Sequence, residues 1–98
     1  DSIVGTQVNI GCGTITANVR LDKKEIMMDI KNTRVNTYKR KLGAIIGDHA
    51  SLGIQVSIMP GKTIGSYSQI GAHSMVEKNI PPNTRFYMKQ NEYQIKMK

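Results

Sequence analysis

Hydrophobic residues recur every six positions along this chain, a period that fits neither an amphipathic helix nor an alternating strand. Glycine directly follows several of these residues, as in Ile46-Gly47, and the same pair occurs earlier as Val4-Gly5 and Ile10-Gly11. A repeat of this length predicts a hexapeptide solenoid, which is an all-β fold built as a parallel β-helix. The uninterrupted repeat occupies Ile46, Leu52, Ile58, Ile64, Ile70 and Val76.

Each hexad is expected to form one short strand and one turn, and three hexads should close a triangular coil. Residues 18 apart then stack on the same face, with the aliphatic side chain pointing inward. The residue after it should be small, because the backbone bends there. The fifth position is also expected to point inward, and Lys62 breaks its pattern. That column contains Val8, Thr14, Ala50, Val56, Ser68, Ser74 and Ile80.

Residues 17–45 interrupt the repeat. Residues 25–31 and 34–38 read as two short strands around an Asn32-Thr33 turn, which predicts a β-hairpin. A long insertion in a solenoid maps to one edge of the coil and often forms the binding face.

The expected organisation is a single β-helix domain over residues 1–98. It divides into a first coil portion, a basic hairpin insertion, two full coils that end at Pro81-Pro82, and a terminal strand at 85–88 with a tail. The coil starts at Asp1 without a cap, so we expect a fragment of a longer, two-domain enzyme. The ranges are 1–16, 17–45, 46–81 and 82–98.

The net charge of +7 is unevenly distributed. Residues 20–41 carry eight basic and three acidic side chains, whereas residues 42–84 are balanced. This pattern favours a small anionic ligand at one place over nucleic acid, which needs a basic stripe with aromatic platforms. No apolar run is long enough for a membrane span, and the single cysteine suits the reducing cytoplasm.

The stretch Gly11–Asn18 reads Gly-Cys-Gly-Thr-Ile-Thr-Ala-Asn, and Lys41 precedes Ile45-Ile46-Gly47-Asp48. This order resembles the C-terminal acetyltransferase domain of bifunctional sugar-1-phosphate nucleotidyltransferases, in the archaeal branch often labelled glucose-1-phosphate thymidylyltransferase. The resemblance covers nearly the whole chain. It implies a left-handed β-helix, a homotrimer, and acetyl transfer from acetyl-CoA to glucosamine-1-phosphate or a related amino-sugar-1-phosphate for UDP-N-acetylglucosamine synthesis. Mg²⁺ is implied only for the nucleotidyltransferase domain, which lies outside these residues.

The resemblance also implies roles for individual residues. Asn18 would orient the acceptor amine, as a catalytic and substrate-binding residue, and Lys41 would meet the acceptor phosphate. The backbone at Cys12 and Ala72 would contact the pantetheine arm of acetyl-CoA. Further candidates are Arg40, for the CoA phosphates, and Lys24, for the substrate. Each has a plainer interpretation, because Asn is common in turns and a charge run is usually a solvated face.

The family's catalytic histidine lies roughly two dozen residues before the asparagine, whereas seventeen residues precede Asn18. We therefore expect the chain alone to lack acetyl transfer. His49 and His73 lie four hexads apart and should point from different faces, which argues against a zinc site. Two alternatives remain open: an acyltransferase for another amine, or a non-catalytic trimerisation or regulatory domain of a sugar nucleotidyltransferase.

Overall fold

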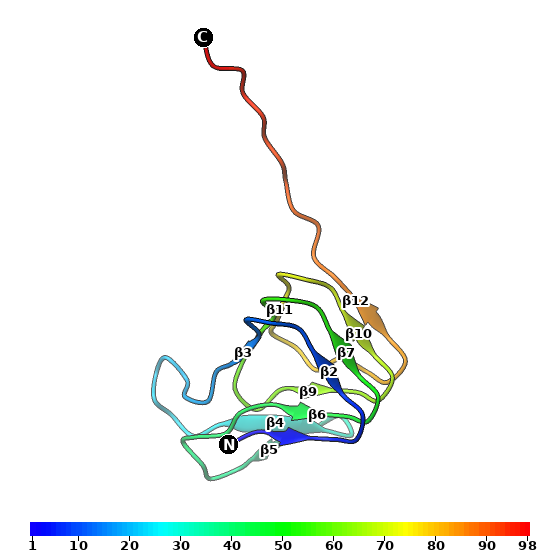
Figure 1. Cartoon of the computed structure of the whole chain (residues 1–98). Coiled ribbons are helices and arrows are strands. Elements are labelled where there is room, and N and C mark those ends of the chain that lie inside the picture. Colours follow the sequence, from blue (N-terminus) through cyan, green and yellow to red (C-terminus); the bar gives the residue numbers. More distant parts are fainter.

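The computed structural model describes all 98 residues as a left-handed parallel β-helix with an attached hairpin and an extended tail (Figure 1). Ten strands of two residues each form three parallel sheets along the sides of the triangular coil. Sheet A contains β1 (Ile3–Val4), β6 (Ile45–Ile46) and β9 (Thr63–Ile64); sheet B contains β2 (Asn9–Ile10), β7 (Ser51–Leu52), β10 (Gln69–Ile70) and β12 (Arg85–Phe86); sheet C contains β3 (Ile15–Thr16), β8 (Ser57–Ile58) and β11 (Met75–Val76).

The register of these strands confirms the six-residue repeat. Ile46 pairs with Ile64, and the equivalent pairs in sheets B and C also lie 18 residues apart. Val4 pairs with Ile46, so the insertion enlarges one corner without shifting the register of the coils. We name the corners by the sheets that they join, as the A–B, B–C and C–A corners.

One column of aliphatic side chains forms the core, as the repeat predicts. Except for Lys62, the first and fifth positions of the middle coils are almost fully buried, including the small residues Ser68 and Ser74. The first coil ends the stack, so Val4 and Ile10 are about half exposed, at 49% and 47%. The core cluster contains Ala44, Ile46, Ala50, Leu52, Val56, Ile58, Ile64, Ile70, Val76 and Ile80.

The glycines of the repeat are explained by the neighbouring coil rather than by a bend of their own backbone. A Cβ on Gly53 would lie 2.7 Å from the nitrogen of Ala72, and one on Gly47 would lie 2.6 Å from that of Ser66. Neither glycine has a positive φ. Any side chain here would therefore push neighbouring coils apart. Contact between the coils, and not a bend of the backbone as expected above, is the reason for these glycines.

The expectation that the coils end at Pro81-Pro82 is wrong, because β12 pairs in parallel with β10 beyond the prolines. The turn after β11 is two residues short, so Ile80 bridges to Ile64 in the first position, not the fifth. Gly65 donates its N–H to the carbonyl of Ile80 in the following coil, as Gly5 does to Ile46 and Gly47 does to Ile64. Pro81 has no N–H to donate, and this is tolerated where no further coil follows.

The hairpin consists of β4 (Met27–Ile30) and β5 (Thr33–Asn36), paired antiparallel. Its turn is Lys31-Asn32, one residue earlier than predicted, with φ of 47° and 63°. Two adjacent residues with positive φ are typical of a type I′ turn, which matches the twist of a two-residue hairpin. The structure therefore confirms a hairpin and corrects its register.

The hairpin packs along the C–A corner. Ile26 is buried against Gly61, whose φ is +72° and whose hypothetical Cβ would lie 2.5 Å from Cγ2 of Ile26. Asn79 donates from Nδ2 to the carbonyl of Asp29 at 3.1 Å. The insertion is therefore fixed to the solenoid at two successive coils.

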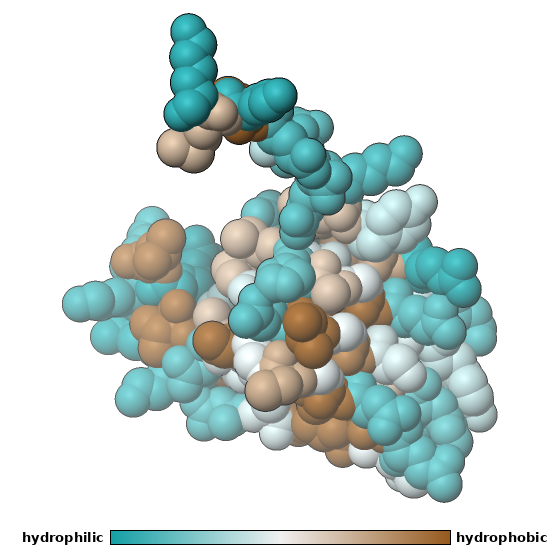
Figure 2. Space-filling view, turned by 45° about the horizontal axis from the view of Figure 1, so that its top comes forward, coloured by the Kyte–Doolittle hydropathy of each residue, from teal (hydrophilic) through white to brown (hydrophobic).

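Residues 89–98 leave the solenoid as an exposed tail (Figure 1). Continuing the register of β12 would place Glu92 over Val76, and stacking a carboxylate on the apolar column is unfavourable. Apolar surface gathers near the point where the tail departs, and Met75 and Met88 line a small pocket there (Figure 2). None of the elements is a helix that could cross a membrane.

Candidate functional site

The two ends of the insertion meet at the C–A corner, and this brings Asn18 and Lys41 together. The N–H of Leu42 donates to the carbonyl of Asn18 at 2.9 Å, so Lys41 lies next to the asparagine. Both side chains are exposed. The Asn18 amide donates from Nδ2 to Oδ2 of Asp1 at 2.9 Å, which leaves its own oxygen available as an acceptor.

Lys24 and Arg40 lie on the same insertion. Asp22 accepts from the N–H of Lys24 at 3.0 Å and pairs with Arg20 at 2.6 Å. These two contacts, the Lys24 N–H first, lower the pKa of Asp22 below its ordinary value. Arg40 is exposed beside Lys41, in a segment that accepts the N–H of Ile26 through the carbonyl of Lys39 at 2.8 Å.

Cys12 and Ala72 lie in one column at the B–C corner, with Ile54 between them and Met88 beyond. A ladder of backbone bonds links this corner: the N–H of Gln55 donates to Cys12 and that of His73 to Ile54, both at 2.9 Å. Ala72 is the open end of the ladder, because its carbonyl and its N–H make no hydrogen bond within the chain. An exposed amide with both groups free suits an amide-rich ligand.

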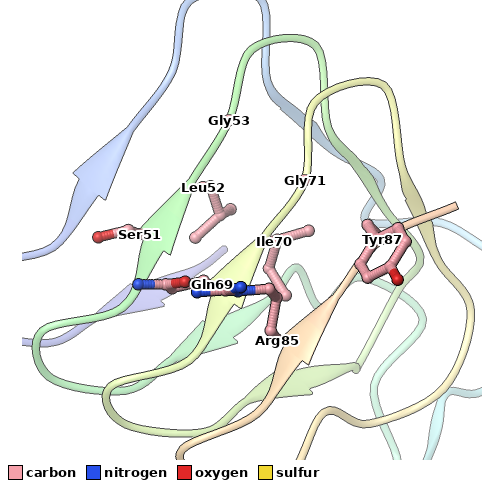
Figure 3. A pocket seen from close by; sticks show the side chains of 8 residues that line it. All are labelled: Ser51, Leu52, Gly53, Gln69, Ile70, Gly71, Arg85 and Tyr87. Carbon is pink, nitrogen blue, oxygen red and sulfur yellow. Dashed lines mark hydrogen bonds between the residues drawn. The ribbon is translucent and has the colours of Figure 1, made fainter.

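A groove of about 470 Å³ runs along the outer face of sheet B beside this column (Figure 3). Gly53 and Gly71 form its floor, since they have no side chain and the preceding Leu52 and Ile70 point inward. Its remaining lining comes from the outward-facing residues Ser51, Gln69, Arg85 and Tyr87.

The sequence analysis missed Gln69, Arg85 and Tyr87 as lining residues. Arg85 donates from Nε to Oε1 of Gln69 at 3.0 Å, and a hypothetical Cβ on Gly71 would lie 2.8 Å from Cβ of Tyr87. A strict period of 18 would have stacked Tyr87 on Gln69. The two-residue shortening after β11 places Arg85 there instead, and the sequence repeat gave no signal for it.

The two histidines lie at different corners, as the hexad count predicted. His49 is at the A–B corner, where its ring stacks on that of Tyr67 with centroids 4.7 Å apart and planes at 10°. His73 is at the B–C corner, in the turn between β10 and β11. Neither lies at the C–A corner with Asn18.

The fold defines the chain as a left-handed β-helix of the hexapeptide-repeat class. A serine acetyltransferase from Entamoeba histolytica, solved with cysteine, superposes with a TM-score of 0.67 over 99% of this chain and 29% of that one. The two sequences are 16% identical, so this likeness concerns the fold alone. No family model matches the sequence.

Sequence similarity identifies the relatives of the chain. It is 53% identical over 89 residues to the "Bifunctional protein GlmU" of Methanococcus maripaludis, covering 91% of this chain and 21% of that protein. It is 42% identical over 80 residues to the "Bifunctional sugar-1-phosphate nucleotidylyltransferase/acetyltransferase" of Sulfurisphaera tokodaii, covering 82% and 20%. The chain is homologous to part of these bifunctional proteins, which confirms the resemblance stated above, and it spans about a fifth of their length.

Proposed function

We propose that this chain is the acetyltransferase part of an enzyme that moves acetyl from acetyl-CoA to the amine of glucosamine-1-phosphate or a related amino-sugar-1-phosphate, in the synthesis of UDP-N-acetylglucosamine. The name of the Sulfurisphaera tokodaii relative supports acetyl transfer and a sugar-1-phosphate. The structural observation that carries the proposal is the meeting of Asn18 and Lys41 across the insertion.

In this proposal the C–A corner binds the acceptor. The free oxygen of the Asn18 amide accepts an N–H of the sugar amine and thereby orients its lone pair toward the thioester. Lys41 attracts the acceptor phosphate as a flexible point charge. Lys24, on the same insertion, is the further candidate for this phosphate.

The B–C corner binds acetyl-CoA. The free N–H and carbonyl of Ala72 pair with an amide of the pantetheine arm, much as an added strand pairs with a sheet edge. Cys12 presents a further free N–H in the same column. The sheet B groove runs beside these positions and gives the arm an open surface.

Sheet C separates these two corners within one chain, so one copy does not bring acceptor and thioester together. We propose that the site forms between neighbouring copies of a homotrimer, where the B–C corner of one copy faces the C–A corner of the next. Arg40, at the C–A corner, would then reach the CoA phosphates of the neighbouring copy. A trimeric mass in light scattering at micromolar concentration is expected, and a monomeric mass would exclude this arrangement.

The reaction joins the amine nitrogen to the thioester carbonyl. A base removes the amine proton, and the CoA thiolate leaves with the electron pair of the broken carbon–sulfur bond. Neither histidine lies at the acceptor corner of its own copy, and the catalytic histidine that the resemblance implies lies outside residues 1–98. We therefore expect no N-acetylation of glucosamine-1-phosphate by this chain alone, and substantial thiol release in that assay would contradict the expectation.

Ligand binding tests the proposal independently of turnover. CoA should raise the melting temperature of the chain, because a ligand that binds only the folded state stabilises it. Glucosamine-1-phosphate binding should weaken about tenfold in Asn18→Ala and in Lys41→Met, but not in Lys98→Met, which alters an exposed cation on the tail. Absence of any CoA effect would favour a non-catalytic assembly domain, and binding of an amine without phosphate would favour another acceptor.

A further inference from the structure

A polar cleft, separate from the sheet B groove, lies at the far end of the C–A corner, two coils from Asn18. It occupies about 860 Å³ between the tip of the hairpin and the last turns of the solenoid. Apart from two prolines, every residue that lines it is polar or charged. This size is within the range of small-molecule sites, and the polar lining points to a charged ligand.

The cleft is cationic. Lys31 and Arg34 contribute from the hairpin, and Lys62 and Lys78 from the solenoid, against the carboxylates of Asp29 and Glu77. The single ion pair among them joins Arg34 to Asp29 at 3.5 Å, and both of those side chains are largely exposed. The three lysines therefore face the cleft without a carboxylate partner within 4.0 Å.

Lys62 is the residue that departs from the solenoid pattern. It occupies the inward column in which the two preceding coils place Ser2 and Ala44. It is half-buried, and together with Arg34 it also lines a neighbouring cavity of about 210 Å³ under the hairpin. Its ammonium makes no ion pair within 4.0 Å.

The walls of the cleft are fixed relative to each other. Asn79 donates to the Asp29 carbonyl of the hairpin and accepts the N–H of Thr63 through Oδ1 at 3.0 Å. It lies in the shortened turn that precedes Ile80, so the departure from the repeat places this amide under the hairpin tip. Because these contacts already fix the walls, less conformational entropy is lost when a ligand binds.

We propose that this cleft binds a small molecule carrying a diphosphate, whose negative charges replace the missing partners of Lys31, Lys62 and Lys78. The volume exceeds the need of a single phosphate, and cations on two opposing walls fit two linked phosphates. The site shares the C–A corner with Asn18 and Lys41, but it lies two coils away from Asn18, and it is separate from the sheet B groove. The proposal stands whether or not the proposed acetyl transfer is correct.

The test is to titrate the 98-residue chain with inorganic pyrophosphate at constant ionic strength. Binding is measured by calorimetry and by the NMR signals of the backbone amides of Asn32 and Asn79. Saturable binding is expected. Lys78→Met should weaken it about tenfold, the loss of one charge-assisted contact, and Lys62→Met should do the same. Lys96→Met, an exposed cation on the tail, should change it less than twofold.

Two results would overturn the proposal: no saturation with pyrophosphate, or equal weakening by Lys96→Met. Lys78 is exposed, so its variant keeps the test valid even if Lys62→Met unfolds the chain. ADP and CoA then distinguish the sources of the diphosphate. If CoA displaces pyrophosphate and Lys78→Met weakens that displacement, the ligand is the diphosphate of CoA. If ADP displaces pyrophosphate but CoA does not, the ligand is a separate nucleotide.

Discussion

Two buried serines in equivalent positions should respond oppositely to the same substitution. Ser68 and Ser74 both occupy the fifth, inward position, at 0% and 1% exposure. The hydroxyl of Ser68 donates to the Pro81 carbonyl at 2.7 Å and accepts the N–H of Thr84 at 3.1 Å, both in the following coil. The hydroxyl of Ser74 has no partner, because at its corner no coil follows.

The expected magnitudes follow from this difference. Ser68→Ala removes two hydrogen bonds and leaves a partly buried N–H unpaired, so the free energy of unfolding should fall by about 1–3 kcal/mol. Ser74→Ala removes a buried polar group that is already unsatisfied, so stability should stay constant or rise by up to about 1 kcal/mol. The two variants should therefore differ by about 1–4 kcal/mol, although the chemical change is identical.

Urea unfolding of the chain at a fixed concentration measures both values, and an unchanged m-value ensures that the midpoints report stability. Ser57→Ala is the matched control, since this half-buried serine faces outward and makes no side-chain hydrogen bond. If Ser74→Ala costs as much as Ser68→Ala, the Ser74 hydroxyl has a partner in solution. The tail or a second copy would then cover this end of the solenoid, and the reasoning above would be refuted.

Three other predictions concern the insertion and the tail. Gly61→Ala should lower stability by about 1–3 kcal/mol in urea unfolding, because it combines a positive φ with a clash against Ile26. The pKa of Asp22 is lowered in the folded chain, so the ionised carboxylate stabilises the fold above its unfolded pKa, and this stabilisation is lost as the pH falls through the folded pKa. Arg20→Gln should raise the pKa of Asp22, as measured by an NMR titration of the carboxyl group. Deletion of residues 89–98, which are exposed throughout, should change the unfolding free energy by less than about 0.5 kcal/mol.

The sequence alone predicted the solenoid because each hexad repeats one local structure. The aliphatic position at Ile46, Leu52 or Ile58 needs no information from elsewhere in the chain to be recognised as inward-facing. The register across the insertion was predictable for the same reason, since the repeat resumes at Ile46 in the phase set by Val4. The roles of Asn18 and Lys41 were implied by the resemblance and not by the period, and they stay predictions.

The remaining features depend on contacts that a period cannot encode. The two-residue shortening after Val76 is visible only when Ile80 is paired with Ile64, and it determines that Arg85 rather than Tyr87 stacks on Gln69. The docking of the hairpin on Gly61 joins residues far apart in sequence and outside the repeat. The polar cleft between them follows from both departures and could not have been predicted from either alone.

The three corners of the coil carry different kinds of structure, and this division bears on how a site is assembled. The B–C corner keeps the plain repeat and ends in the free backbone groups of Ala72, which suits a ligand recognised through amides. The C–A corner carries the insertion, with its excess of cations, which suits ligands recognised through phosphate. Because a flat sheet separates the two corners, chemistry that needs both requires a second copy of the chain. Under the proposed acetyl transfer, a solenoid with this distribution would therefore act only in association with further copies, and the symmetry of that assembly would decide which corners meet.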